Sequence, residues 1–352
     1  MNDMEKRAQY FIGSRMLMLI QFFRHIGEQS RMKKNTRVIH PFWVIVQKEV
    51  SDHIRSWRFI ILISIIALTC LGSMYTALMN ISEAIKSSDP EDTFLFLKLF
   101  TISDGTLPSF FVFISFLGPL LGISLGFDTI NSEHNKGTMS RILAQPVHRD
   151  YLINAKFIAA LTIVSIMFFV LGFLVIGFGL VSIGVPPTVE EFLRIIFFVI
   201  LSIVYVAFWL NLAILFSVRF RQPATSALAC IAIWLFFTVF YPLIVDLITK
   251  PIEPSEFATG QQIYIYEKLK LILMRILPNE LFSEATTTLL MPSVRSIGPL
   301  TLEQIHGTIP GPLPLAQSVL LVWPQVTVLI AATILCFALS YVSFMKREIR
   351  SR

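Results

Sequence analysis

The chain has 352 residues, of which 55% are hydrophobic and only 15% charged, and its mean hydropathy is +0.70. Soluble domains carry about 25% charged residues, so this composition excludes a soluble globular protein and indicates lipid as the solvent. Each of the three cysteines, Cys70, Cys230 and Cys336, lies in an apolar run, which predicts packing residues and no disulfide framework. The six histidines lie outside these runs without ligand spacing, so no metal site is expected.

Residues 1–58 are expected to form a cytoplasmic and interfacial region. The apolar stretch at residues 11–20 is broken by Arg15, and no small-residue cleavage site follows, so it is not a signal peptide. From Ile39 onward the pattern predicts an amphipathic helix lying at the membrane surface. Its apolar positions at helical spacing are Ile39, Phe42, Val46, Val50, Ile54 and Trp57, with Lys48, Glu49, Asp52 and Arg55 between them.

Six later stretches have the length and apolarity of membrane-spanning helices, which need about 20 residues. Period-2 alternation is absent from them, so the predicted class is all-α, with one six-span domain over residues 59–348. The expected spans are about 59–79, 110–127, 157–185, 195–218, 224–248 and 318–345.

The distribution of basic residues predicts the orientation of these spans. With both ends of the chain inside, the inside segments hold 21 of the Lys and Arg residues and the outside segments hold 8. Inside loops of membrane proteins carry the basic excess, so we expect both termini in the cytoplasm and a multi-pass protein of the cell (cytoplasmic) membrane. The same asymmetry accounts for the net charge of +6, so the expected partner is the lipid bilayer and no nucleic acid.

The second span carries Gly118, Gly122 and Gly126 at every fourth position. These glycines form one smooth stripe on a helix, which allows a close approach by another helix of the same chain or of a partner subunit. Gly122 to Gly126 also match G-x-S-x-G, but a nucleophile at a strand-to-helix elbow is not expected inside an apolar span.

The spans contain almost no ionisable residues, which would mark an ion or proton pathway. Asp128 and Asp246 lie at span edges, and Asn211, deep in the fourth span, is expected to form an interhelical hydrogen bond. The chain also lacks a G-x-x-x-x-G-K-[ST] phosphate loop, so it is not expected to hydrolyse ATP itself.

Residues 128–156, between the second and third spans, hold the most informative pattern. Gly137 can end one helix, Thr138 can cap the next, and Pro146 can close it, which predicts a short, stiff helix just below the membrane. Such a helix can transmit force from a soluble partner, whereas the alternative is an ordered loop without that role. The candidate residues are Asp128, Glu133, Gly137, Thr138, Arg141, Pro146 and Arg149.

Two regions are expected on the outside. The long loop at residues 249–317 predicts an amphipathic helix over 264–277 and a second helix capped by Asn279 and ending at Leu290. Before the fourth span, Glu190, Glu191 and Arg194 are similar to the paired glutamates and arginine of CAAX-type intramembrane proteases, with a spacing one residue short. An intramembrane hydrolase or protease that uses Glu190 and Glu191 is therefore the alternative function, although a charged turn that caps the span is the favoured interpretation.

The segment after the second span resembles the membrane subunits of ABC exporters of the ABC-2 type. That family typically has an acidic residue, a glutamate, a Gly-Thr pair, Pro-x-x-Arg and a lysine, which match Asp128, Glu133, Gly137-Thr138, Pro146 with Arg149, and Lys156. The resemblance extends to the six spans and the interfacial helix. It is closest to the branch that includes the permease of the nitrous-oxide-reductase maturation system.

The resemblance implies a permease subunit of an exporter that is not itself an enzyme. Two such subunits, identical or paralogous, would pair with two separate ATP-binding-cassette ATPase subunits, which would bind the ATP and Mg. Residues 138–146 would be the coupling helix on the ATPase, and residues 219–224 a second, shorter contact. Relatives move lipids, polysaccharides, peptides, drugs and metal-centre precursors.

Overall fold

The computed structural model describes residues 40–87, 94–103, 107–143, 148–255, 258–294, 296, 298 and 311–346. The chain divides into two compact units, Met1–Val44 and Ile45–Arg352. Only residues 40–44 of the first unit are described, so the architecture below is that of the second. All regular elements in the described ranges are helices, which confirms the all-α class.

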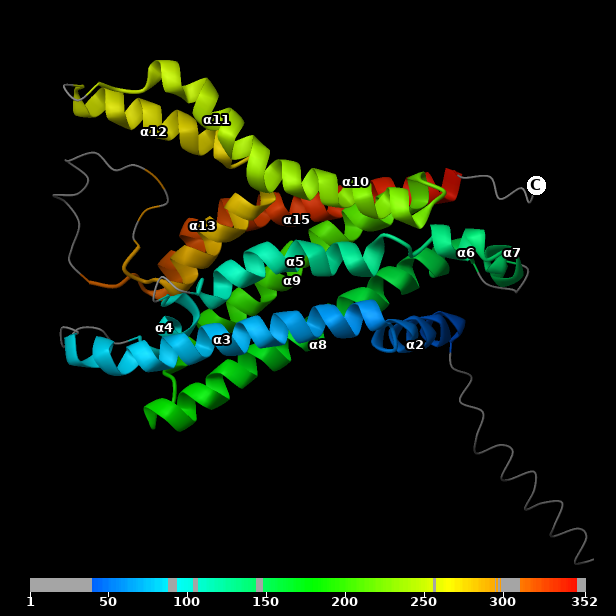
Figure 1. Ribbon diagram of the computed structural model, residues 1–352, viewed down its shortest axis with the longest axis horizontal. Helices are drawn as coiled ribbons and strands as arrows, with labels where there is room; N and C mark the ends of the chain where they lie inside the picture. Colours follow the sequence, from blue (N-terminus) through cyan, green and yellow to red (C-terminus); the bar gives the residue numbers. More distant parts are fainter. Residues whose placement is uncertain are drawn as a thin grey trace, which may run out of the picture. The chain divides into compact units, whose positions relative to one another are not determined.

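Six helical segments are long and apolar enough to cross a membrane, and each contains most of one predicted span, which confirms the six-span topology. Within the second unit they run side by side along a common direction (Figure 1). They are α3 (Trp57–Ser87), α5 (Phe110–Gly126), α8 (Arg149–Ile183), α9 (Val189–Arg219), the fifth span of α10 (Pro223–Leu235), η1 (Phe236–Phe240) and α11 (Tyr241–Thr249), and α15 (Leu315–Lys346).

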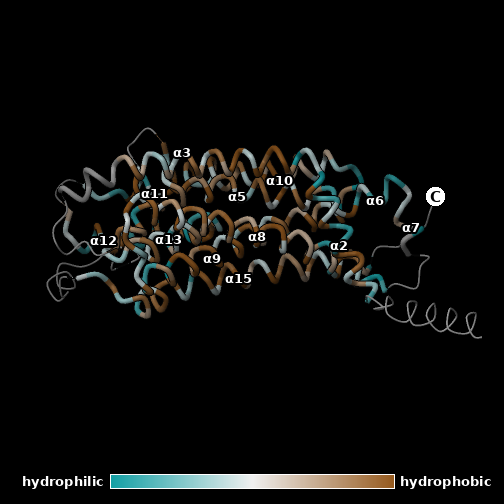
Figure 2. Tube along the Cα trace, turned by 90° about the horizontal axis from the view of Figure 1, so that it is seen from below, coloured by the Kyte–Doolittle hydropathy of each residue, from teal (hydrophilic) through white to brown (hydrophobic). Residues whose placement is uncertain are grey.

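The shorter helices gather at the two ends of this bundle (Figure 1). One end holds α2 (Pro41–Ile54), α6 (Asn131–Asn135) and α7 (Thr138–Leu143), and the other holds α4 (Leu95–Thr101) and α13 (Pro278–Leu290). Figure 2 shows hydrophobic residues along the middle of the long helices and hydrophilic residues where α2, α6 and α7 lie.

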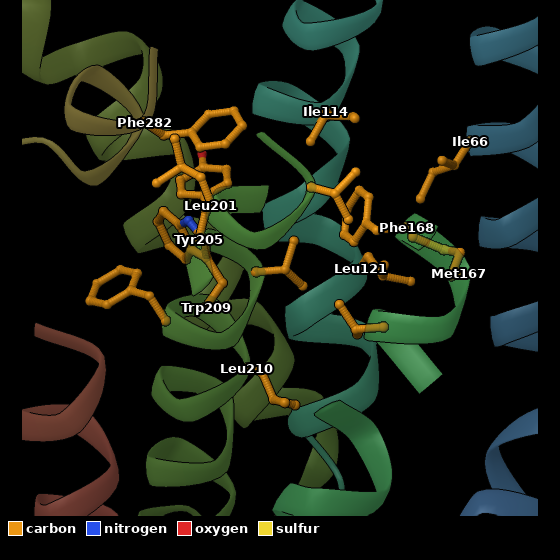
Figure 3. Close-up of a cluster of buried hydrophobic side chains, with 14 of the residues drawn as sticks. Ile66, Ile114, Leu121, Met167, Phe168, Leu201, Tyr205, Trp209, Leu210 and Phe282 are labelled. Atoms are coloured by element: carbon orange, nitrogen blue, oxygen red, sulfur yellow. The ribbon is translucent and has the colours of Figure 1, made fainter. Parts of the chain in front are cut away.

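Helix α9 forms the centre of the bundle. Its residues Tyr205, Trp209 and Leu210 have no exposed surface, and α9 contacts α5, α8, α10, α13 and α15. The ring of Tyr205 stacks on Phe282 of α13, with 4.4 Å between centroids and 11° between planes; Figure 3 shows this pair and the surrounding apolar side chains. Packing on α9 therefore holds these spans in register, while α3 packs on α5 and α8.

Local sequence signals explain where the central helices begin and end. Helix α8 ends at Gly184, whose φ of 79° lies in the left-handed region that glycine adopts without strain. Thr188 then starts α9 with a capping box, because its hydroxyl accepts from the Glu191 N–H while the Glu191 carboxylate accepts from the Thr188 N–H. Pro223 starts α10 at a position where a missing N–H costs nothing.

The fifth span is interrupted by a π-helical turn at Phe236–Phe240, between α10 and α11. Pro242 follows it and has no N–H to donate to the carbonyl one turn earlier, so a regular α-helical bond is impossible there. A π turn accommodates one extra residue and is a recognised cause of helix bending. The span differs here from the single uninterrupted helix expected over residues 224–248.

Several expected details differ in the structure. Trp57 does not belong to the interfacial helix, since α2 ends at Ile54 and Trp57 begins α3. Asn279 does not cap α13, because that helix begins at Pro278 with Leu277 in the cap position. The helix expected over residues 264–277 is present as α12 (Gly260–Met274), so it begins and ends earlier than expected, and it packs along α11.

Candidate coupling site

The segment that leaves the second span makes two short helices. After α5 ends at Gly126, the chain turns into α6, passes Gly137 and enters α7. Gly137 has a φ of 67°, a left-handed conformation that a β-branched residue adopts only with strain. Thr138 is the first residue of α7 and not its cap. Pro146 lies outside the described residues.

Helix α6 is fastened to the end of α9. The Ser217 hydroxyl accepts hydrogen bonds from the backbone N–H groups of Ile130 (2.9 Å) and Asn131 (3.2 Å), which are otherwise unpaired donors at a helix start. The Asn135 side-chain amide donates to the Arg221 carbonyl at 3.0 Å. The α9–α10 turn and the α6 segment, both expected as ATPase contacts, are thus joined directly.

Glu133 connects α6 to three other parts of the chain. Its carboxylate accepts a hydrogen bond from the Thr138 hydroxyl, which also donates to the Glu133 carbonyl at 3.1 Å. The ammonium groups of Lys48 in α2 and Lys156 in α8 each lie 3.5 Å from the same carboxylate. The residue therefore fixes the turn at Gly137 from within and ties it to both neighbouring helices.

The strongest of these contacts joins the interfacial helix to the third span. Lys156 Nζ lies 2.8 Å from Glu49 Oε2, and the two side chains are only 3% and 8% exposed. Burial acts to raise the pKa of Glu49, but the Lys156 ammonium and the hydrogen bond from it hold that pKa below its usual value. Glu49 is therefore charged, and a buried charge is stable only when it is paired in this way.

A second ion pair lies on the other side of the site, between Arg58 and Asp128. Arg58 Nη2 lies 2.7 Å from Asp128 Oδ2, and the Arg58 guanidinium lies 5.0 Å from the centroid of the Phe127 ring. Between the two pairs lies a cavity of about 340 Å³ whose lining includes Glu49, Arg58, Asp128 and Lys156. Charged groups from α2, α3, α6, α8 and the turn after α5 thus converge on one polar pocket.

The remaining candidate residues face in different directions. Arg141 is exposed, while its neighbour Met139 is buried, so α7 is held by one face and presents a cation on another. Arg149 turns away, donating to the Phe344 carbonyl at 3.2 Å and lying 5.5 Å from the centroid of the Phe344 ring. Arg141 is therefore available to a partner, whereas Arg149 secures the start of α8 against α15.

The glycine stripe of α5 lies against α9 of the same chain. A Cβ on Gly122 would lie 2.7 Å from the Val206 carbonyl oxygen, and one on Gly126 would lie 2.7 Å from the Ala213 Cβ. At Gly118 the nearest atom would be a Val206 methyl at 3.1 Å. The close approach therefore occurs within the chain. Near the middle of the same α9, the Asn211 amide donates to the Thr333 carbonyl of α15 at 3.4 Å.

The charged turn before α9 has a structural role at the opposite end of the bundle. Glu191 accepts from the backbone N–H of Phe96 at 2.9 Å, which fixes α4, and from Thr188. Arg194, with no exposed surface, donates to the carbonyls of Leu289 (2.9 Å) and Leu313 (2.5 Å).

Glu190 completes this turn, lying 2.9 Å from Arg194 and accepting from the Leu315 N–H at 3.0 Å. Both glutamates are thus engaged in capping and ion pairing. A general acid or base needs a lone pair or proton directed at a substrate, so these contacts favour the capping interpretation over the hydrolase.

Several members of the candidate coupling site have no clear signal in the sequence. Lys48 and Glu49 were assigned to the polar face of an interfacial helix, and Arg58 to the general excess of inside charge. The available signal was the register of α2, because Glu49 lies three residues after Val46 and thus on the same face. Ser217 carried no signal of its own.

Comparison with known proteins agrees with these observations. Six apolar helices with ion-paired helices at one end define a multi-pass membrane protein, and residues 43–349 match the family model described as ABC-2 family transporter protein. The chain therefore belongs to the ABC-2 family and is a membrane permease subunit of an ABC transporter. It is similar to the probable ABC transporter permease protein NosY of Pseudomonas aeruginosa, with 25% identity over 209 residues, covering 57% of this chain and 68% of that protein.

Proposed function

We propose that this chain is the permease half of an exporter in the cytoplasmic membrane, driven by separate ATPase subunits that bind ATP and Mg. Two copies, or this chain and a paralogue, would form the translocation path. Residues 138–146, which begin with α7, would be the coupling segment on the ATPase. The family membership and the absence of a phosphate loop in the sequence support a separate source of energy.

The observation that carries this proposal is the way α6 and α7 are held. Glu133, Asn135 and the α6 start are bonded to α2, α8 and α9, so a displacement of α7 would reach three helices at once. Rigid elements joined by short polar contacts transmit movement because packed interfaces do not deform continuously. A loop with no coupling role would not need such a connection to the spans.

Charge reversal at the exposed cation of α7 tests the proposal. In the Arg141→Glu variant a wrong charge enters the docking contact, where juxtaposed like charges cost several kcal/mol. We expect normal membrane insertion but much weaker co-purification of the ATPase subunit and loss of its stimulation. The matched control is Lys268→Glu, an exposed reversal on α12 at the opposite end. Equal assembly of both variants would remove the basis for placing the contact on α7.

A further inference from the structure

A second pocket lies at the same end of the bundle as the coupling site, between the ends of three spans. Its volume is about 490 Å³, and it is lined by Val218, Arg219, Arg221, Ser343 and Lys346. Arg219 ends α9, Arg221 lies in the turn to α10, and Lys346 ends α15. Three cations and one hydroxyl therefore surround one hollow, and the lining contains no carboxylate.

These three cations differ from three other basic residues near helix ends, which have carboxylate partners. Arg58, Lys156 and Arg275 are each paired with a carboxylate. In the part of the chain that the structure describes, no ion pair is formed by Arg219, Arg221 or Lys346. The dipoles of α9 and α15 favour cations at their C-terminal ends, but Arg221 follows the end of α9, and three like charges around one pocket repel. An anionic ligand would offset that repulsion.

The helix surfaces next to the pocket are apolar and exposed. On α15, the positions one, two and three turns before Lys346 are Val342, Leu339 and Leu335, which are 45%, 48% and 60% exposed. These positions recur at helical spacing, so they lie on the same face as Lys346. A ligand with its charged group in the pocket can therefore lay an apolar part along this face.

Helix α10 repeats the arrangement. Leu228, Ile231 and Leu235 follow Arg221 at helical spacing and are 67%, 39% and 41% exposed. The pocket thus lies where charged helix ends give way to lipid-facing surface, which is the depth of phospholipid headgroups. Basic pockets between spans on the cytoplasmic side are suited to anionic headgroups.

We infer that this pocket binds the phosphate of an anionic phospholipid of the cytoplasmic leaflet, with its acyl chains along the exposed faces of α10 and α15. The inference rests on the proposed function only in placing this end of the bundle at the cytoplasm. The Arg221 carbonyl accepts from Asn135 of α6, so the bound lipid would also steady the turn that holds the coupling segment.

The test measures lipid retention by the full-length chain. The protein is reconstituted in vesicles of phosphatidylcholine mixed with phosphatidylglycerol, extracted in mild detergent, and the retained lipid is quantified by native mass spectrometry. We expect selective retention of phosphatidylglycerol. Each single change, Arg219→Gln, Arg221→Gln or Lys346→Gln, should weaken retention about fivefold, since a basic residue at an anionic surface contributes about 1 kcal/mol.

Two controls separate a site from general charge attraction. Arg55→Gln removes an exposed arginine just after α2, outside this pocket, and should leave phosphatidylglycerol retention unchanged. Millimolar inorganic phosphate should not displace the lipid, since it lacks the acyl contacts. Each variant is first shown to be folded by its elution profile and its unfolding temperature, so a loss of lipid cannot come from unfolding.

Three outcomes would overturn the inference. Wild-type retention in all three pocket variants would show that the pocket does not bind the lipid. Displacement by inorganic phosphate would assign the pocket to a soluble anion. Lost ATPase co-purification with unchanged lipid retention would assign the surface to the ATPase contact. Failure of the lipid result alone leaves the Arg141 experiment unaffected, so the two proposals are distinguishable.

Discussion

Replacing Lys156 by methionine would remove the buried cation that lies between the carboxylates of Glu49 and Glu133. Lys156 Nζ is 2.8 Å from Glu49 and 3.5 Å from Glu133, and its side chain is 3% exposed. Breaking a buried ion pair by removing one partner costs about 3–5 kcal/mol, because the remaining charge is left uncompensated. Lys48 still lies within 3.5 Å of both carboxylates and is half exposed, so we expect the lower end, about 3 kcal/mol.

Chemical unfolding of the detergent-solubilised protein would measure this loss. The matched control is Lys136→Met, an exposed lysine after α6, which should change stability by less than about 0.5 kcal/mol. The double variant Lys156→Met/Glu49→Met removes both charges, and its stability should recover toward wild type. The reasoning would be refuted by a Lys156→Met protein as stable as the control, or by a double variant no more stable than the single one.

Three further predictions concern packing, the opposite end of the bundle and pH. Gly122→Ala should destabilise the fold by about 1–3 kcal/mol in the same assay, because its Cβ would lie 2.7 Å from a backbone oxygen of α9, whereas Gly177→Ala, with open space, should not. Arg194→Met should cost about 3 kcal/mol or more by leaving buried carbonyls unpaired, and lysine should not rescue it because it lacks the planar fork. Burial lowers the pKa of His53, while Glu49 and the acidic residues Asp52 and Asp128 oppose that shift and Lys156 adds to it. The unfolded state then binds the proton more tightly, so stability should fall as pH drops below about 6.5, and His53→Gln should flatten that part of the unfolding profile; an unchanged profile would contradict this.

The six spans could be predicted from the sequence because each is marked by one long run of apolar residues. A run of apolar residues long enough to cross a bilayer has few alternative structures, since every backbone polar group must be paired inside it. The break between α6 and α7 also followed from local chemistry, since Gly137, expected to end a helix, has a positive φ there. These features depend on neighbours in sequence.

The parts that could not be predicted depend on contacts between distant residues. Glu49 looks like a solvent-facing charge until Lys156, more than a hundred residues later, is placed against it. Helix α4 is only seven residues long, so its sequence alone does not distinguish it from a loop. Its Phe96 and Phe100 are buried because the helix packs against α8 and α9. Glu191 looks like a free carboxylate until the Phe96 N–H is seen to bond it. Burial and pairing of this kind are properties of the folded chain.

The π-helical turn of the fifth span has a consequence for which neighbours that span can have. One extra residue rotates everything after it by about 100° around the helix axis. The first half of the span, α10, packs on α5 and α9, whereas the second half, α11, packs on α12. Two contacts join α11 to α12: Tyr241 donates to the Leu273 carbonyl at 3.1 Å, and Asp246 lies 2.8 Å from Lys270. Without the extra residue, the side of α11 that makes these contacts would point about a quarter turn away from α12. A single-residue deletion within Phe236–Phe240 would therefore exchange the partner of half a helix while leaving its length and hydropathy almost unchanged.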